Sequence, residues 1–417
     1  MSTELPAGAY DPGPGWGLRF WSVFGGQASS LIGSALTQFV LLWWITDTTG
    51  SVSALALAGL FALLPQALLG PIGGAFADRY SRRMIMIVTD AISAACMVVL
   101  IVLFLNEAVE LWHVFAMMFI RSAMQAFQGP AAAASTAMLV PRSFIPRAAG
   151  LNQSLQGLML VAAAPLGAVA MAVMPIGYAL AIDVVTAIAG IVPLLVFRIP
   201  QDRAALEDSM GFWSELREGF DTVWGNPGLR RLYALMALVI MCIMPSFTLV
   251  PLLVKDHFGG GAPEVALMEG MAGLGMVAGG LIAAAFPPRN RIVCILWGFA
   301  LSSLLLGLVG FAPSDMLWLA TLFWSLSGVI YMVGNAPMIA LLQTTVPNHL
   351  QGRVLSLLTT VMALAAPAGL ALATPLGELI GIKLLFVVMG FVSAAIALLG
   401  FASRPVMEIE RGGNQGT

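Results

Sequence analysis

The sequence contains very little charge. Only 10% of its 417 residues are Asp, Glu, Lys or Arg, well below the roughly 25% that is usual in soluble domains. Because 59% of the residues are apolar and the mean hydropathy is +0.93, a single water-soluble globule could not bury them all. The scarcity of charge therefore excludes a soluble protein and places the chain in a lipid bilayer.

An excess of basic residues is also missing, which excludes two classes of partner. The formal net charge is −2, and no arginine-rich arm or interleaving of aromatic and basic residues occurs, so we expect no nucleic acid. Lysine is present only at Lys255 and Lys383, and neither lies in a GxxxxGK[ST] phosphate-binding loop. We therefore expect no ATP hydrolysis by that route.

Cysteine and histidine are few and scattered. Cys96, Cys242 and Cys294 each fall singly inside an apolar run, so neither a disulfide framework nor a C-x-x-C metal site is available. The three histidines lie at expected loops or helix ends and cannot together bind a metal or form a triad. We therefore expect no cofactor, no metal and no enzymatic activity.

What the sequence does contain is a series of long apolar runs. At about 20 apolar residues for each crossing of a bilayer, they predict twelve transmembrane helices. The expected ranges are 19–45, 52–77, 84–105, 111–138, 149–173, 177–197, 231–254, 264–286, 292–311, 316–343, 354–379 and 383–402. Because the number is even, both ends of the chain lie on one side.

Arginine marks that side. Nearly all arginines fall in loops on the side of the termini, whereas the only lysines and arginines in the loops on the other side are Lys255 and Lys383. Positive charge is retained on the cytoplasmic face of a membrane. We therefore expect both termini in the cytoplasm, and a multi-pass protein of the bacterial inner membrane.

A long polar segment divides the chain into two equal halves. The expected parts are a cytoplasmic tail at 1–18, a six-helix bundle at 19–198, a cytoplasmic linker at 199–229, a second bundle at 230–403 and a cytoplasmic tail at 404–417. Within the linker, apolar residues between Phe212 and Trp224 recur at helical spacing, with charged residues on the opposite face. This pattern predicts an amphipathic helix on the membrane surface, in contact with lipid.

The two halves share a weak internal repeat. Gly73-Gly74 matches Gly279-Gly280, and Val140-Pro141 matches Val346-Pro347, each pair at the same offset of 206 residues. Matching loops in the same order indicate that a six-helix unit has been duplicated.

The sharpest motif is Gly74-x-x-x-Asp78-Arg79-x-x-Arg82-Arg83, in the loop between the second and third helices. Gly74 would let two helices approach closely, Asp78 would meet the positive end of a helix dipole, and the arginines would pair with carboxylates or lipid phosphates. Such a loop could close the cytoplasmic side as a gate. We assign Gly352 and Arg353 in the second half to the same gate.

With this loop, the sequence resembles the major facilitator superfamily, whose signature reads G-x-x-x-D-R-x-G-R-R; here Ser81 replaces the usual Gly. Segments 119–127, 139–165, 181–186, 351–354 and 366–369 resemble bacterial macrolide-efflux permeases, in the drug:proton antiporter branch. The resemblance covers essentially the whole chain. It implies an all-α membrane protein of two pseudo-symmetric six-helix halves that alternate access to a cavity at the midplane.

One family pattern is only partly present. Exporters of this superfamily usually carry G-x-x-x-G-P-x-x-G-G on helix five, and only Gly157, Pro165 and Gly167 remain here, in loose spacing. The sequence therefore supports the fold more strongly than proton antiport.

Four ionisable residues fall inside expected spans, where charge is costly and marks candidate functional sites. Asp90 and Arg121, on consecutive antiparallel helices, are expected to pair with each other. Asp183 and Glu269 have no basic residue at a similar expected depth, so they are the main candidates for taking up and releasing protons. All four residues are proton-coupling candidates.

A polar stripe on the first helix has three- and four-residue spacing and therefore occupies one face. We expect that face to line a substrate cavity together with residues of the fourth and tenth helices. The candidates are Gln27, Ser30, Ser34 and Gln38 on the first helix, Gln125 and Gln128 on the fourth, and Trp324, Tyr331 and Asn335 on the tenth.

Together these features predict a secondary transporter that exports a bulky, largely apolar small molecule, macrolide-like by the resemblance, in exchange for protons. Its energy source would be the proton gradient. An alternative with the same fold is export of a siderophore or a lysolipid. A less favoured alternative is a membrane receptor or scaffold that transports nothing.

Overall fold

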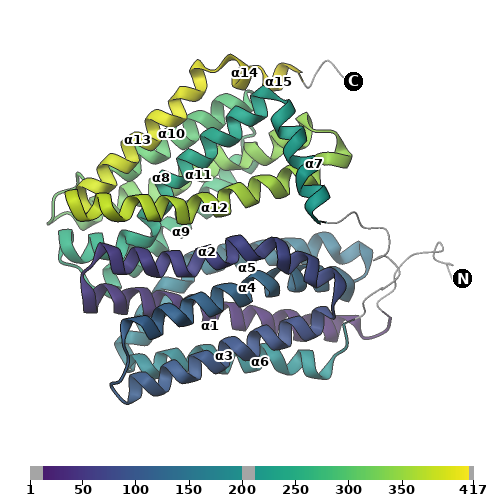
Figure 1. Cartoon of the computed structure of the whole chain (residues 1–417), viewed down its shortest axis with the longest axis vertical. Helices are drawn as coiled ribbons and strands as arrows, with labels where there is room; N and C mark the ends of the chain where they lie inside the picture. The colour runs from purple at the N-terminus through teal and green to yellow at the C-terminus, as the bar shows by residue number, and fades with distance from the viewer. Residues whose placement is uncertain (1–12, 200–211, 413–417) are drawn as a thin grey trace, which may run out of the picture. The chain divides into compact units, whose positions relative to one another are not determined.

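The computed structural model describes residues 13–199 and 212–412, and these are almost entirely helical (Figure 1). The long helices of the first half are α1 (Trp16–Thr49), α2 (Val52–Arg79), α3 (Arg82–Leu105), α4 (Leu111–Leu139), α5 (Ile145–Val173) and α6 (Ile176–Val196). Those of the second half are α8 (Pro227–Phe258), α9 (Ala262–Ala285), α10 (Arg291–Val309), α11 (Leu317–Thr345), α12 (Asn348–Ile380) and α13 (Ile382–Ala402). Each of the twelve expected spans corresponds to one of these helices, which confirms the predicted fold class.

Eleven helices within the described ranges are long and apolar enough to cross a membrane, and the chain is a multi-pass membrane protein. α4 is the long helix outside that set, although it has 29 residues. It carries Arg121, Gln125 and Gln128 along its length. In a membrane-spanning protein, polar side chains in a helix indicate a face turned toward a cavity or toward other helices.

The described residues form two compact units. The first comprises residues 13–40, 68–159 and 170–199, and the second comprises 41–67, 160–169 and 212–412. In the first unit, α3 packs against both α4 and α6. In the second, α10 packs against α11 and α13, and α9 packs against α11.

Glycine permits the closest helix contacts in both units. A Cβ atom at Gly73 would lie 2.1 Å from the carbonyl oxygen of Ala126, so the backbones of α2 and α4 touch there. A Cβ atom at Gly279 would lie 2.2 Å from the carbonyl oxygen of Val329 on α11. The repeat found in the sequence thus places equivalent glycines at equivalent helix contacts. The assignment of close approach to Gly74 was wrong, because nothing lies within 4 Å of a Cβ atom there.

The amphipathic helix of the linker is present as α7 (Phe212–Gly225). Glu218 forms an ion pair with Arg353 on α12. A Cβ atom at Gly219 would lie 2.8 Å from the Arg353 carbonyl oxygen, so α7 rests closely on α12. Phe220 and Trp224 stack on each other with ring centroids 4.9 Å apart and remain exposed. These rings are available for contact with a membrane surface.

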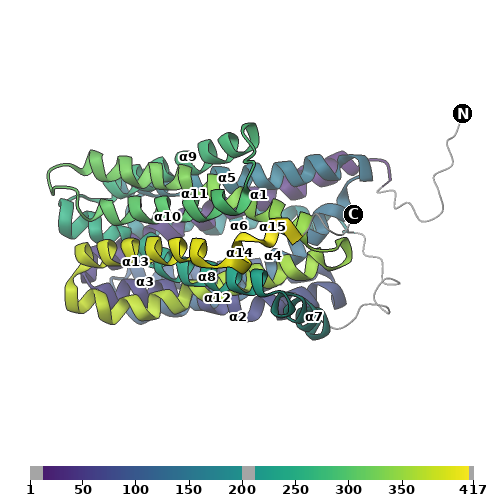
Figure 2. The ribbon, with the colours of Figure 1, turned by 90° about the horizontal axis from the view of Figure 1, so that it is seen from above.

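The segment after α13 begins with two short helices, α14 (Arg404–Met407) and α15 (Ile409–Gly412), beside α8 and α10 (Figure 2). Val406 and Ile409 are buried, and a Glu410 carboxyl oxygen accepts a hydrogen bond from the Arg291 backbone N–H at 2.8 Å. Glu410 thereby caps the first turn of α10, whose own N-cap residue makes no side-chain cap bond. The first part of the expected C-terminal tail is therefore packed against the second unit.

Candidate functional site

The first unit contains a cavity of about 340 Å³ between α1, α4 and α5. One part of its wall is apolar and includes Phe20, Phe24 and Met86. The polar part consists of six carboxamide side chains, Gln27, Gln125, Gln128, Asn152, Gln153 and Gln156, and the hydroxyl side chains of Ser135 and Thr136. Such a wall offers many hydrogen-bond donors and acceptors without a formal charge.

Three of these carboxamides were predicted from the sequence as cavity residues, and three were missed. Asn152, Gln153 and Gln156 lie near the start of α5, and their spacing of three and four residues puts them on one face of the helix. That spacing is visible in the sequence. The prediction missed these three residues because they lie close to a helix end, where polar residues are common.

A buried carboxyl group adjoins the amide part of the wall. Asp90 on α3 is 5% exposed and accepts hydrogen bonds from Gln27 Nε2 at 3.2 Å and from Gln128 Nε2 at 2.5 Å. Gln128 Nε2 also donates to Gln27 Oε1 at 3.1 Å, and Gln27 Nε2 donates to the carbonyl oxygen of Gly190 at 3.4 Å. The Asp90 carboxyl is therefore held by neutral groups from α1 and α4.

The expected pair of Asp90 and Arg121 is not formed, and that prediction was wrong. Gln128 is the α4 residue at the depth of Asp90. Arg121 precedes it by seven residues, which is about 10 Å along a helix. At that level Arg121 meets Asp183 on α6, so the expectation that Asp183 has no basic neighbour was also wrong.

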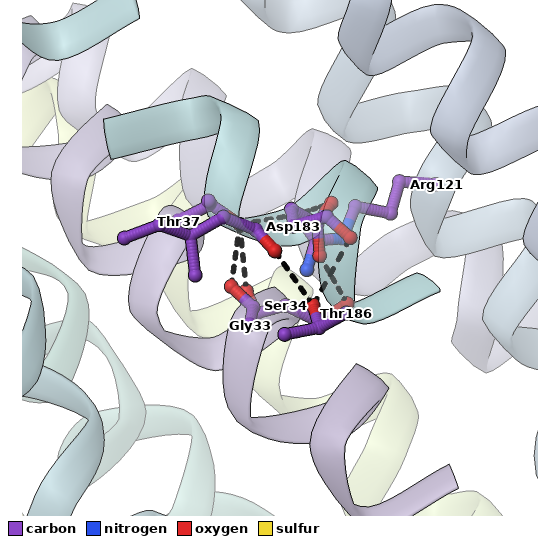
Figure 3. A network of polar contacts seen from close by, with 7 residues as sticks. Gly33, Ser34, Thr37, Arg121, Asp183 and Thr186 are labelled. Atoms are coloured by element: carbon purple, nitrogen blue, oxygen red, sulfur yellow. Dashed lines mark hydrogen bonds and ion pairs between the residues drawn. The ribbon is translucent and has the colours of Figure 1, made fainter. Parts of the chain in front are cut away.

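The ion pair of Arg121 and Asp183 belongs to a polar network of α1, α4 and α6 (Figure 3). An Arg121 guanidinium nitrogen lies 3.6 Å from Asp183 Oδ2 and donates to Thr37 Oγ1 at 3.0 Å. Ser34 Oγ donates to Asp183 Oδ1 at 2.9 Å. The side chain of Asp183 is 4% exposed and that of Arg121 is 15% exposed. A buried carboxylate with one cationic and one hydroxyl partner is well compensated.

The polar stripe of α1 does not face one cavity throughout. Gln27 lines the cavity, whereas Ser34 is bonded to α6 and Ser30 is buried where α1 passes Gly190 of α6. Gln38 is half-buried and lies outside the lining of this cavity. The expectation that the whole stripe faces a ligand is therefore wrong for Ser30 and Ser34, because α6 supplies their neighbours.

The loop motif joins helices inside the first unit. Arg83 donates to the carbonyl oxygens of Leu194 and Leu195, the latter at 2.7 Å, and so satisfies the C-terminal end of α6. Arg82 reaches the Ala134 carbonyl oxygen at 3.5 Å and pairs with Asp78 at 3.5 Å.

The remaining motif positions are more exposed. The side chain of Asp78 is 64% exposed and does not cap α3, because Ser81 Oγ accepts the cap bond from the Met84 N–H. Arg79 is exposed at the end of α2. In the second half, Gly352 is exposed with open space around it, and Arg353 is bound to α7. A role of these residues as a gate remains a prediction.

The candidates of α9 and α11 belong to the second unit. Trp324 is 1% exposed between the rings of Phe247 and Phe386, and its Nε1–H has no partner among the residues that the structure describes. Tyr331 packs edge-on against Phe299 with ring centroids 5.5 Å apart, and Asn335 is half-buried.

Glu269 on α9 is half-buried and forms no hydrogen bond or ion pair within the described part of the chain. The described residues contain no group of three or more His, Cys, Asp or Glu side chains that could hold a metal ion, so Glu269 is not part of such a group.

Comparison with known proteins gives one consistent result. The family model of the Major Facilitator Superfamily matches residues 23–370. The chain is 32% identical to macrolide efflux protein A of Streptococcus pyogenes over 387 residues, covering 92% of this chain and 95% of that protein. It is 21% identical to the multidrug efflux pump Tap of Mycobacterium bovis, covering 91% of each.

Solved structures agree on the fold. A bacterial homologue of the human lysosomal transporter Spinster, in an inward-facing and unoccupied conformation, matches with a TM-score of 0.68 at 16% identity. The match covers 96% of this chain and 98% of that one. At this identity the likeness shows the fold alone.

Proposed function

Because this chain belongs to the Major Facilitator Superfamily, and is thus a membrane transporter and not an enzyme, we propose that it exports bulky, largely apolar compounds of the macrolide type in exchange for protons. The observation that carries the proposal is the amide-lined cavity beside a buried carboxyl group in the first unit. The relatives named for macrolide and multidrug efflux support the same substrate class.

The lining of the cavity suits such a substrate. The aromatic rings and methionine contact apolar surface, and the six carboxamides pair with hydroxyl and carbonyl groups. A volume of about 340 Å³ is at the lower end of the roughly 300–1,000 Å³ of small-molecule sites. The cavity would therefore hold one hydroxylated portion of a larger molecule.

An anionic cargo such as a siderophore is less well supported. The residues that line the cavity include no Arg, Lys or His, and Arg121 is already paired with Asp183. An anion would leave water without gaining a positive partner, which is unfavourable in a site of low dielectric constant.

For the coupling, we assign proton uptake to the carboxyl groups inside the membrane. Protonation of Asp183 would remove the charge that holds Arg121 and free the guanidinium to take another partner. Glu269 forms no hydrogen bond or ion pair within the described ranges, so protonation of its carboxyl group would break no such interaction. We place both termini in the cytoplasm of a bacterial cell, as the arginine distribution indicates, so that protons enter from outside.

The direct test is uptake of a labelled macrolide into inside-out proteoliposomes. We expect accumulation when the lumen is made acidic, and little or none without a gradient. Glu269→Gln should reduce the gradient-dependent part at least several-fold and leave the protein folded, because the amide matches the carboxyl in shape. Empty liposomes and collapse of the gradient are the controls.

Three outcomes would contradict the proposal. Accumulation that does not depend on the gradient would reject proton coupling, and macrolide binding without accumulation would indicate a receptor. If neither binding nor accumulation occurs, the macrolide class is rejected, and lysolipids become the next substrates to measure.

A further inference from the structure

The carboxamides in the cavity wall fall into two groups. Gln27 and Gln128 are bonded to Asp90 and to each other, so their positions are fixed by protein partners. The other four form no hydrogen bond within the described part of the chain, and they are Gln125, Asn152, Gln153 and Gln156. Polar side chains in membrane helices that bond to no protein group mark a place where water or a ligand binds.

These four amides lie close enough together to bind one small group. Gln156 follows Asn152 by four residues and Gln153 by three, so the three side chains are neighbours on one side of α5, at Cβ separations of about 5–6 Å between Gln156 and each of the others. Gln125 of α4 lines the same cavity of about 340 Å³. A single ring that carries several polar groups can therefore meet the amides of both helices.

The wall requires a ligand that both donates and accepts hydrogen bonds. Each carboxamide has N–H donors and an oxygen acceptor. Ser135 and Thr136 add only acceptors, because their hydroxyl protons are donated to the Ala131 and Ala132 carbonyl oxygens of their own helix. Ester, ketone and ether oxygens of a ligand cannot donate, so they would leave the oxygens of the wall unpaired, which is costly where water is excluded. A hydroxyl group does both, and a sugar carries several of them on one ring.

An aromatic surface lies in the same wall. The rings of Phe20 and Phe24 stack with their centroids 5.4 Å apart, and both residues line the cavity. Phe20 is 1% exposed and Phe24 is half-buried, so Phe24 is the ring that is more accessible to a ligand. The negative face of an aromatic ring attracts weakly positive C–H groups. A sugar ring has C–H groups on its faces and hydroxyl groups at its edge, so it matches both parts of the wall.

We propose that this cavity binds a neutral sugar residue of the substrate, and that the protein exports amphipathic glycosides, of which glycosylated macrolides are one kind. The inference rests on the proposed function and deepens it, because it names the part of the substrate that the site recognises. The described residues that line the cavity include no charged side chain, so the matching sugar is a neutral one. The apolar body attached to it need not be a macrolide lactone.

The test is equilibrium binding, without transport, to the full-length protein in lipid nanodiscs free of glycoside detergents. The probes are a labelled macrolide that carries a neutral sugar and the same macrolide after hydrolysis of that sugar; both keep the lactone and the amino group. Loss of the sugar should raise the dissociation constant at least about tenfold, because several hydrogen bonds worth about two- to tenfold each are lost.

A second pair of ligands extends the test beyond macrolides. An alkyl glucoside, below the concentration at which it forms micelles, should bind to the protein and displace the labelled macrolide. A methyl-capped oligo(ethylene glycol) ether with the same alkyl chain has acceptor oxygens and no donor, so it should displace the macrolide poorly.

Two variants and a matched control locate the sugar. Asn152→Leu and Gln125→Met roughly keep the shape of the side chain and remove the amide, so each should reduce the ratio of the two macrolide affinities about two- to tenfold. In the double variant the sugar should contribute little. Asn106→Leu makes the same chemical change at the exposed end of α3, outside the lining, and should keep the wild-type ratio. A ratio is insensitive to partial unfolding, because both ligands meet the same folded fraction.

The results separate this inference from the proposed function. Equal affinities for the two macrolides, equal displacement by the glucoside and the ether, an unchanged ratio in the double variant, or no binding of any glycoside would overturn the sugar site. If gradient-driven export of the macrolide persists in any of those cases, the proposed function stands. Conversely, amide-dependent binding of the alkyl glucoside without macrolide export would reject the proposed function and keep the site.

Discussion

Replacing Arg121 with Gln should abolish export and lower the stability of the protein by about 3–5 kcal/mol, because the buried carboxylate of Asp183 loses its cationic partner. Ser34 alone would remain to bind that carboxylate. Asp183→Asn should cost less, since Arg121 keeps its bond to Thr37 and is partly exposed. Thermal unfolding in detergent and export into proteoliposomes measure the two effects.

The double variant provides the decisive comparison. When Arg121 is replaced by Gln and Asp183 by Asn, no unpaired charge is left, so stability should return to within about 1 kcal/mol of the wild type. Export should not return with it, because no charged group is left there to respond to protons. If Arg121→Gln unfolds at the wild-type temperature, or if the stability losses of the single variants simply add, the two residues are not energetically coupled.

Replacing Gly73 with Ala should destabilise the first unit, whereas Gly74→Ala should not. The new methyl group at position 73 would lie 2.1 Å from the Ala126 carbonyl oxygen and 3.0 Å from the Phe127 Cα, both on the backbone of α4. No rotamer change can relieve a backbone contact, so α2 and α4 must separate, at a cost of about 1–3 kcal/mol or more. α4 carries Gln125 and Gln128, so the cavity should lose ligand affinity as well.

The adjacent glycine is the matched control. Gly74 has open space around it, and Ala is the better helix former by about 1 kcal/mol, so Gly74→Ala should unfold at the same or a slightly higher temperature. The same contrast is expected in the second half. Gly279→Ala should destabilise the protein, because the new methyl group would meet the Val329 carbonyl oxygen, whereas Gly280→Ala should not, because nothing lies within 4 Å of a Cβ atom there. Equal melting temperatures for Gly73→Ala and Gly74→Ala would show that α2 moves away from α4 without cost.

The positions of the helices follow from local properties of the chain. A run of about 20 apolar residues must cross the bilayer as a helix, since no other single segment satisfies its backbone groups there. The predicted span 84–105 and the observed α3 (Arg82–Leu105) differ by two residues at one end. Helix ends in the connecting segments are set by caps such as Ser81 and Asn226, and these displace the observed boundaries by a few residues.

The partners of the buried charges do not follow from local properties. Arg121 and Gln128 are seven residues apart on α4 and therefore lie about two turns apart along one helix. Which of them is level with Asp90 depends on how far α3 and α4 are shifted along each other. A shift of two turns exchanges Arg121 for Gln128 and thereby pairs Arg121 with Asp183. The contrast between Gly73 and Gly74 has the same origin, because a rotation of about 100° about the helix axis separates them.

The sequence by itself predicted a membrane protein with twelve long apolar helices, because the cost of exposing backbone and charge to lipid acts on each segment separately. The sequence also identified the polar and ionisable residues that fall inside the membrane-spanning helices and therefore need partners there. The tertiary structure decided which of them meet: the amides of α1, α4 and α5 around one cavity, Asp90 behind two of those amides, and Arg121 with Asp183. Those meetings depend on the relative rotation and shift of packed helices, which are fixed by side-chain contacts between segments distant in the chain.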